Sequence, residues 1–183
     1  MKPNFIQLNL KLNDFVETDL TFSQSINYTT HWQKYTASLA REKDFYKASV
    51  NEFPVNNHME RFLTVLPKNL LEEEIPKIVL HTIDPTNDGK HAMLGPHIDK
   101  IRKCSINWYI NPIGEETKYY AYKGCKLTEV DSFIAKKDEV WLLNSDIPHS
   151  VDLKPNHTRK ILAFSFVNMP FEKVSEYFEQ TND

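Results

Sequence analysis

The fold is decided by residues 77–122, KIVLHTIDPTNDGKHAMLGPHIDKIRKCSINWYINPIGEETKYYAY. Short apolar runs alternate here with turn-forming segments such as DPTNDG at 84–89 and NPIG at 111–114. The pattern continues to about Val167 and predicts eight strands: 78–83, 92–98, 104–110, 117–122, 128–135, 139–143, 149–153 and 159–167. Many short strands at intervals of about 8–12 residues are typical of an antiparallel sandwich or barrel rather than of alternating α/β units.

Other periodicities flank this strand-rich segment. Apolar and polar residues alternate in a first strand-like run from Ile6 to Leu12. Helical spacing or capping residues predict four helices, at about 30–50, 57–66, 70–74 and 171–180. The second of them is closed by Pro67.

The predicted fold is mainly β with flanking α: an eight-stranded antiparallel jelly roll, or cupin-like double-stranded β-helix. The 183 residues are expected to form a single domain. Its predicted parts are an N-terminal strand with supporting helices (1–76), the jelly-roll core (77–167) and a C-terminal helix (168–183).

Composition and charge narrow the functional classes. A hydrophobic content of 40% is too high for a disordered chain. The formal net charge of -3 does not favour nucleic acid as a partner. No apolar run is long enough to span a membrane, and the two cysteines, Cys104 and Cys125, are too few for a disulfide framework. We therefore expect a soluble, cytoplasmic protein without membrane contacts; its oligomeric state is not predicted.

The segment Pro96-His97-Ile98-Asp99 carries the main chemical signal. In an extended chain His97 and Asp99 lie on one face and can converge on a single ion. The segment PHS, which starts the seventh predicted strand, adds His149, 50 residues after Asp99. Two histidines and one carboxylate form the facial triad of non-haem iron(II), which leaves positions open for co-substrate and oxygen. A chance H-x-D pair and a histidine in a surface turn are the competing interpretation.

Arg159 begins the last predicted strand, ten residues after His149. By alternation it lies with Ile161 on the less apolar face, whereas Lys160 lies on the face expected to pack against helices. A guanidinium inside a barrel needs a partner, and its planar fork suits a carboxylate. Lys160 is the alternative for this role, and two solvated residues at a strand start are the simpler interpretation.

Together, PHIDKIRKCSINWYINP, ETKYYAY, DEVWLLNSDIPHSV and TRKILAFSF resemble the iron(II)- and 2-oxoglutarate-dependent oxygenase superfamily. The resemblance covers about residues 80–166 and is greatest to small phage and bacterial hydroxylase-like proteins, with some likeness to aspartyl/asparaginyl hydroxylases. It implies Fe(II) held by His97, Asp99 and His149, with 2-oxoglutarate as co-substrate and Arg159 on its distal carboxylate. Succinate and carbon dioxide would be released as the prime substrate is hydroxylated.

The resemblance also suggests further co-substrate contacts. Asn107 and Tyr109 share one face of the strand after the H-x-D pair, and Tyr119 is a third candidate. One departure concerns the position two residues after the arginine, where many relatives have Ser or Thr and this chain has Ile161. This substitution affects the expected grip on the co-substrate rather than the metal site.

Two other functions remain as alternatives. The first is a non-oxidative, metal-dependent cupin-like isomerase or hydrolase that uses the same three ligands. The second is a non-catalytic jelly-roll binding module. For an oxygenase the prime substrate is expected to be a small molecule, an amino acid or a protein side chain, and no motif selects among them.

Overall fold

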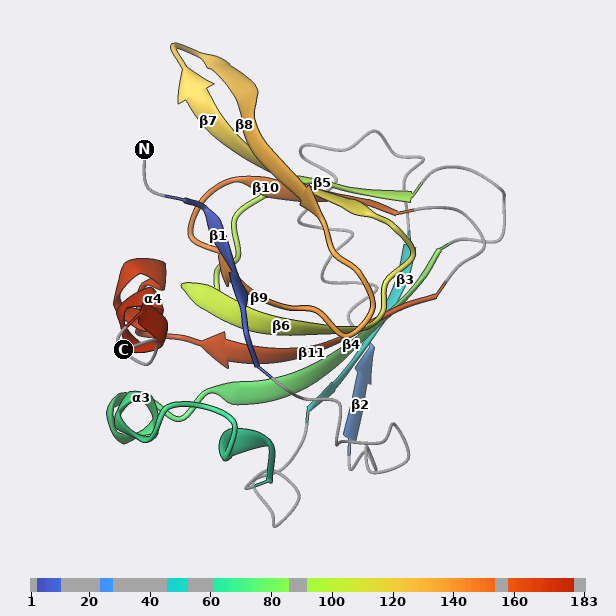
Figure 1. Ribbon diagram of the computed structural model, residues 1–183. Helices are drawn as coiled ribbons and strands as arrows, with labels where there is room; N and C mark the ends of the chain where they lie inside the picture. Colours follow the sequence, from blue (N-terminus) through green and yellow to red (C-terminus); the bar gives the residue numbers. More distant parts are fainter. Residues whose placement is uncertain are drawn as a thin grey trace.

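Figure 1 presents the computed structural model, in which two antiparallel sheets face each other. The structure describes residues 3–10, 24–27, 46–52, 61–85, 92–153 and 158–179. All eight strands predicted between residues 78 and 167 are present as β4 to β11. The predicted mainly β jelly roll is therefore confirmed, whereas the division into three parts stays a prediction.

The jelly roll takes four of these eight strands from each sheet. The seven-stranded sheet has the order β1 (Phe5–Leu8), β9 (Val140–Asn144), β6 (Cys104–Asn111), β11 (Arg159–Phe166), β4 (Lys77–Pro85), β3 (Tyr46–Glu52) and β2 (Gln24–Asn27). The four-stranded sheet has the order β5 (Ala92–His97), β10 (His149–Leu153), β7 (Glu116–Lys123) and β8 (Lys126–Ile134). Strands β1, β3 and β2 thus extend the larger sheet beyond the jelly roll.

Alternation along the strands of the larger sheet separates two cores. The outward side chains, including Ile106 on β6 and Phe164 on β11, are fully buried in a cluster with helical residues. Inward side chains such as Tyr109 and Ile161 form a second cluster with Tyr119 and Phe133 of the smaller sheet. The interior between the sheets is therefore partly aromatic, and the inward face predicted for Arg159 is the one that looks into it.

Two short helices cover the outer face of the larger sheet. Helix α3 (Lys68–Glu73) contributes Leu70, and helix α4 (Phe171–Glu179) contributes Phe171 and Val174 to the outer core. Immediately after α3, the Glu74 carboxylate accepts the backbone N–H groups of residues 167, 168 and 169 at 2.7–3.2 Å. This contact ties α3 to the turn that leads from β11 into α4.

The N-terminal part departs from the prediction. The helix expected over 30–50 is wrong at its C-terminal end, because residues 46–52 form β3 and pair with β4. Pairing along the edge of a sheet overrides the helical spacing of the side chains there. Residues 28–45 lie outside the described part, as do residues 57–60 of the next predicted helix, whose residues 61–63 are helical. The strand β2 at Gln24–Asn27 was not predicted.

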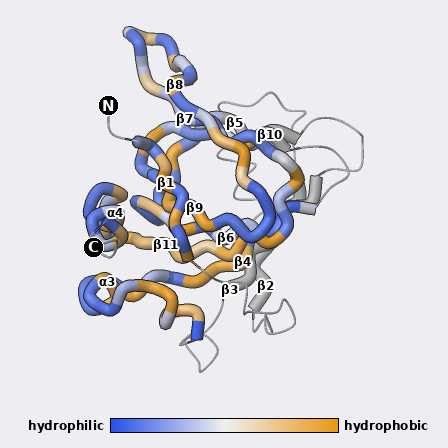
Figure 2. The backbone as a smooth tube through the Cα atoms, viewed as in Figure 1, coloured by the Kyte–Doolittle hydropathy of each residue, from blue (hydrophilic) through white to orange (hydrophobic). Residues whose placement is uncertain are grey.

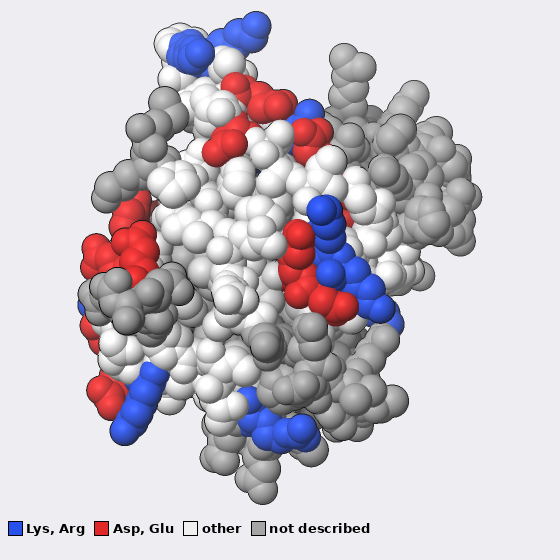
Figure 3. Space-filling view, in the orientation of Figure 1, with Lys and Arg blue, Asp and Glu red and all other residues white. Residues whose placement is uncertain are grey.

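The β7–β8 hairpin projects from the barrel (Figure 1). Its two-residue loop begins at Gly124, whose φ of +62° is strained for residues with a side chain. In Figure 2 the projecting end alternates blue, hydrophilic pieces with short orange ones, whereas β9 and β11 contain orange, hydrophobic stretches. Figure 3 shows Lys and Arg at the tip, where Lys123 pairs with Lys126, and acidic groups nearer the barrel. Within the described residues, no helix combines the length and apolar character needed to cross a membrane.

Candidate metal centre

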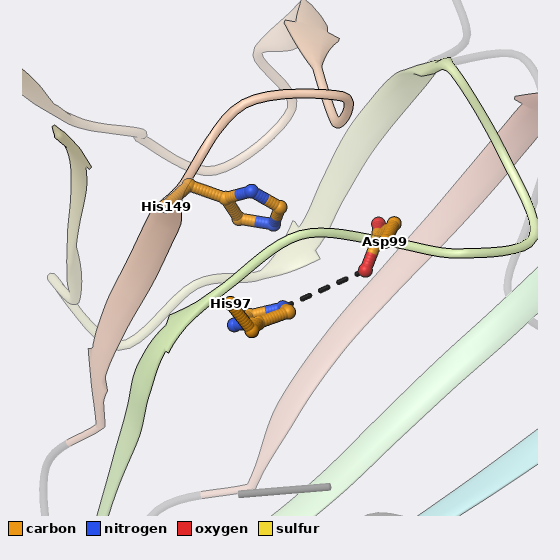
Figure 4. Close-up of side chains that lie close together, drawn as sticks. All are labelled: His97, Asp99 and His149. Carbon is orange, nitrogen blue, oxygen red and sulfur yellow. Dashed lines mark ion pairs between the residues drawn. The ribbon is translucent and has the colours of Figure 1, made fainter. Parts of the chain in front are cut away.

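His97 and Asp99 lie where β5 ends and the chain turns toward the next strand. The Asp99 backbone N–H donates to the Ser145 carbonyl at 3.0 Å, which fixes this turn against the segment before β10. His149 is the first residue of β10 and lies opposite His97 in the antiparallel register. Two adjacent strand ends therefore bring all three side chains together, and they point toward one another in Figure 4.

The geometry of the three side chains is compact. One potential ligand atom from each of His97, Asp99 and His149 lies within 4.8 Å of the others. The His97 Nε2 atom is 3.5 Å from Asp99 Oδ1, and the two imidazole centroids are 4.3 Å apart. His149 Nδ1 is 2.9 Å from the Ile147 carbonyl, so the protonated Nδ1 can donate there and leave Nε2 as the ligand. No other group of three such residues in the described ranges has metal-ligand spacing.

Electrostatics keep two of these ligands in the protonation state that binds a metal. Burial lowers the pKa of His149 to about 4, and the neighbouring His97 ring acts in the same direction. Burial alone would raise the pKa of Asp99, but the Arg102 guanidinium and the His97 hydrogen bond hold it well below 3.8. At neutral pH the site therefore offers a neutral imidazole at His149 and an ionised carboxylate at Asp99.

Arg159 lies on β11 beside a second buried acid. Its Nε donates to Glu115 Oε1, and the other oxygen of Glu115 accepts the Ile113 backbone N–H at 2.7 Å. Arg159 is 6% exposed and Glu115 is 1% exposed. The Arg159 Cζ atom also lies 5.5 Å from the centroid of the Tyr109 ring. The guanidinium is thus fixed inside the barrel by an ion pair and an aromatic face.

Several polar atoms on the inner faces of β4, β6 and β7 are buried without a hydrogen bond of ordinary geometry among the described residues. They are the Tyr109 and Tyr119 hydroxyls, Asn107 Oδ1, Ser105 Oγ and His81 Nε2. The Tyr119 ring lies 5.9 Å from the His149 ring and shares a cluster with Tyr109, which contacts Arg159. Burial raises the pKa of Tyr109 and holds that of Tyr119 well above 10, so both are hydroxyl donors. Unpaired buried polar groups are rare, and here they form a path suited to a polar ligand.

The structure places most of the residues singled out from the sequence on the inner faces of the two sheets. Asn107 and Tyr109 share the inward face of β6, and Tyr119 lies opposite His149 on β7. Lys160 is half-buried and neighbours Arg159 on a strand whose side chains alternate, so it faces away from the interior. Cys104 packs in the outer core, where burial raises its thiol pKa to about 12, and Cys125 is an exposed thiol in the hairpin loop.

Sequence reasoning missed three polar residues of the interior: Arg102, Glu115 and His81. Arg102 contacts Asp99 from the same turn, so its spacing of three residues was a usable signal. Glu115 stands two residues before the strand predicted at 117–122, at a position where an acid is ordinarily solvated. His81 lies in no recognisable motif. Its inward position follows only from the register of β4 with β11, which pairs it with Ile161.

The fold was compared with those of solved structures, and one similar structure with a TM-score above 0.5 supports it. An oxidoreductase of the 2OG-Fe(II) oxygenase family from Burkholderia pseudomallei superposes with a TM-score of 0.51 and 14% identity, over 80% of this chain and 74% of that chain. A prolyl-4-hydroxylase from Pseudomonas putida gives a TM-score of 0.48 and 12% identity over 89% of this chain and 92% of its own. A prolyl hydroxylase from Trichoplax adhaerens, solved with a hypoxia-inducible-factor peptide, gives a TM-score of 0.48 and 14% identity. The match covers 94% of this chain and 86% of that chain. No protein-family model and no curated sequence matches the chain.

Proposed function

We propose that this protein is an Fe(II)- and 2-oxoglutarate-dependent oxygenase that hydroxylates its prime substrate and releases succinate and carbon dioxide. The observation that carries the proposal is the inward-facing path of polar groups from the His97, Asp99 and His149 cluster to the buried guanidinium of Arg159. A group of three metal-ligating side chains alone is compatible with many kinds of enzyme. Three metal-ligating side chains in the same interior as a buried carboxylate-binding guanidinium support a metal-chelating dicarboxylate as co-substrate.

The donor set fits iron(II). His97, Asp99 and His149 supply two nitrogens and one oxygen, the combination typical of non-haem iron sites with open positions. When bound, the iron would activate oxygen and couple the oxidation of 2-oxoglutarate to hydroxylation. The protein's own part is to hold the three ligands on two rigid strand ends, with the Ile147 carbonyl orienting the His149 ring.

The part of the interior around Arg159 can bind a carboxylate even though Glu115 already pairs with this arginine. A guanidinium carries five N–H donors, and Glu115 engages the one at Nε. The edge formed by the two Nη groups can then donate two hydrogen bonds to a second carboxylate. The Tyr109 hydroxyl, beside Arg159, supplies the hydroxyl donor that Ile161 lacks.

The interior is also closed to bulk water on one side. Phe133 and Trp141 stack with their ring centroids 4.5 Å apart. Phe5 packs against both in tilted and edge-to-face contacts and stacks on Tyr119 at 5.6 Å. An aromatic wall next to the polar path lowers the local dielectric constant and strengthens the hydrogen bonds inside it. It also keeps solvent from competing for the Tyr119 and Tyr109 hydroxyls.

An anaerobic titration tests the proposal. Metal-free protein receives Fe(II) and then 2-oxoglutarate, and the weak visible charge-transfer band of the chelate is followed. The band should appear only with both additions and disappear in His149→Ala, whereas Lys160→Met should retain it. Fe(II) binding without the band would favour a non-oxidative metal enzyme, and no metal binding would favour a binding module. Small molecules, free amino acids and peptides are then screened as prime substrates by their stimulation of succinate release.

A further inference from the structure

Arg102 closes one side of the candidate metal centre. Its Nε donates to Asp99 Oδ2 at 2.6 Å, and its Nη1 donates to Ser165 Oγ at 3.3 Å. Ser165 lies near the end of β11, so Arg102 connects the turn that carries Asp99 to the opposite sheet. The Asp99 and Arg102 side chains are 7% and 16% exposed, so solvent hardly competes for this contact.

The contact makes the two carboxylate oxygens of Asp99 unequal. Oδ1 faces the first histidine, 3.5 Å from His97 Nε2, whereas Oδ2 is held by the guanidinium. A charge-assisted hydrogen bond of this length is strong, and it occupies the oxygen that a two-oxygen coordination would need. The carboxylate is therefore fixed for coordination through one oxygen.

The positive charge of Arg102 also favours the binding of an anionic co-substrate at the metal. A positive group beside the site opposes the binding of a metal cation and favours the binding of an anion at that metal. Asp99 and Arg102 form one neutral pair, and Glu115 and Arg159 form another in the same interior. A divalent cation and a doubly charged anion added together leave this buried region neutral, whereas either alone does not.

The geometry points to Arg102 as a positioning residue that keeps Asp99 a one-oxygen ligand and so keeps a coordination position open for the dianionic co-substrate. The inference rests on the proposed function for the identity of that co-substrate. Without Arg102, Asp99 gains a second free oxygen and the co-substrate loses both a coordination position and a compensating charge.

The substitution Arg102→Met tests this role through a split between two affinities. Under anaerobic conditions Fe(II) should bind the variant as tightly as the wild type or more tightly. The affinity of the Fe(II)-loaded variant for 2-oxoglutarate, read from the charge-transfer band, should fall by roughly 10- to 100-fold, the scale expected when a positive charge several ångströms from a bound dianion is removed. A residue that only supports the local structure would weaken metal binding first.

An infrared difference spectrum of Fe(II) binding, recorded with isotope-labelled aspartate, reads the coordination directly. Carboxylates bound through one oxygen have a wider separation of the two stretching bands than those bound through both. We expect the wider separation in the wild type and the narrower one in Arg102→Met. This measurement needs neither co-substrate nor turnover.

Two further variants keep the test decisive. Lys103→Met removes the neighbouring ion pair with Asp146, which is 2.9 Å long and about half exposed, and should leave both affinities unchanged. Arg102→Lys keeps the charge but cannot reach Asp99 and Ser165 together, and it should fall between Arg102→Met and the wild type. It replaces Arg102→Met if that variant does not fold.

The outcomes separate this inference from the proposed function. Weakened Fe(II) binding, an unchanged 2-oxoglutarate affinity or an unchanged infrared separation in the Arg102 variants would overturn the role of Arg102. If the wild type binds Fe(II) but never forms the band, the proposed function fails while the infrared comparison still decides the role of Arg102. Absence of Fe(II) binding by the wild type would overturn both.

Discussion

Glu115 and Arg159 form an ion pair inside the barrel, near the strand ends farthest from the His97 and His149 pair. Both side chains are almost fully buried, and the second oxygen of Glu115 is held by a backbone N–H. A buried pair of this kind adds little net stability compared with an apolar pair, but removing one partner leaves an uncompensated buried charge. Glu115 therefore acts as an internal counter-ion that allows the Arg159 guanidinium to be buried inside the barrel.

Substituting Glu115 tests this balance. Glu115→Gln should lower the free energy of unfolding of the ligand-free protein by about 3–5 kcal/mol, since the Arg159 charge loses its partner. The dianion 2-oxoglutarate, added with Mn(II), should restore part of that loss and raise the melting temperature of the variant more than that of the wild type. Calorimetry with and without the ligands measures both effects. Equal ligand-induced shifts in the two proteins would contradict the role of Glu115 as counter-ion.

The choice between Arg159 and its neighbour Lys160 is tested by paired substitutions. Arg159→Met should weaken 2-oxoglutarate binding by roughly 10- to 150-fold, because a hydrogen bond to a charged group contributes about 1.5–3 kcal/mol. Lys160→Met is the matched control, and it should leave the affinity within about twofold of the wild type, because alternation along β11 turns this side chain away from the interior. The measurement is a titration of the Fe(II)-loaded protein, and the reverse order of effects would move the carboxylate-binding role to Lys160.

Stability should decrease on acidification because of two buried histidines. Burial lowers the pKa of His149 to about 4 and that of His81 to about 3, from 6.5. Between pH 6.5 and these values the unfolded chain binds protons that the folded chain does not. The free energy of unfolding therefore falls as pH falls through this range, by at most about 1.4 kcal/mol per pH unit for each histidine.

Urea denaturation of the metal-free protein between pH 7 and pH 4 measures this slope. His81→Gln removes one of the two groups without touching a candidate metal ligand, and it should reduce the slope by about half between pH 6 and pH 5. An identical slope in the variant would mean that His81 does not carry the depressed pKa.

The sequence predicts the strands after residue 77 more accurately than the elements before it. Strands β4 to β11 could be predicted because turn residues such as Gly124 and Pro112 separate apolar runs that fit a half-buried sheet. The strand at Tyr46–Glu52 could not, because its conformation depends on pairing with the edge of β4, and no local pattern encodes that contact.

The candidate site shows the same division. His97 and Asp99 follow from two-residue alternation, and the ten-residue spacing from His149 to Arg159 added the guanidinium. Arg102 and Glu115 take their importance from the partners that the fold gives them. Local spacing therefore identifies the groups that would bind ligands, whereas the groups that orient and neutralise them emerge only from the packed structure.

Removing the Tyr109 hydroxyl should have opposite effects on the stability of the ligand-free protein and on its affinity for the co-substrate. It is fully buried beside the polar side chains of Asn107 and Thr117, but no hydrogen bond of ordinary geometry reaches it among the described residues, so the ligand-free protein bears part of the cost of an unpaired hydroxyl, which is about 1–3 kcal/mol. Tyr109→Phe should therefore leave the free energy of unfolding of the ligand-free protein unchanged or raise it. The same variant should bind 2-oxoglutarate more weakly, because the donor beside Arg159 is lost. Urea denaturation and titration of the Fe(II)-loaded protein measure the two effects. A variant that is less stable in the absence of ligand and binds the co-substrate normally would show that the hydroxyl serves the fold rather than the ligand.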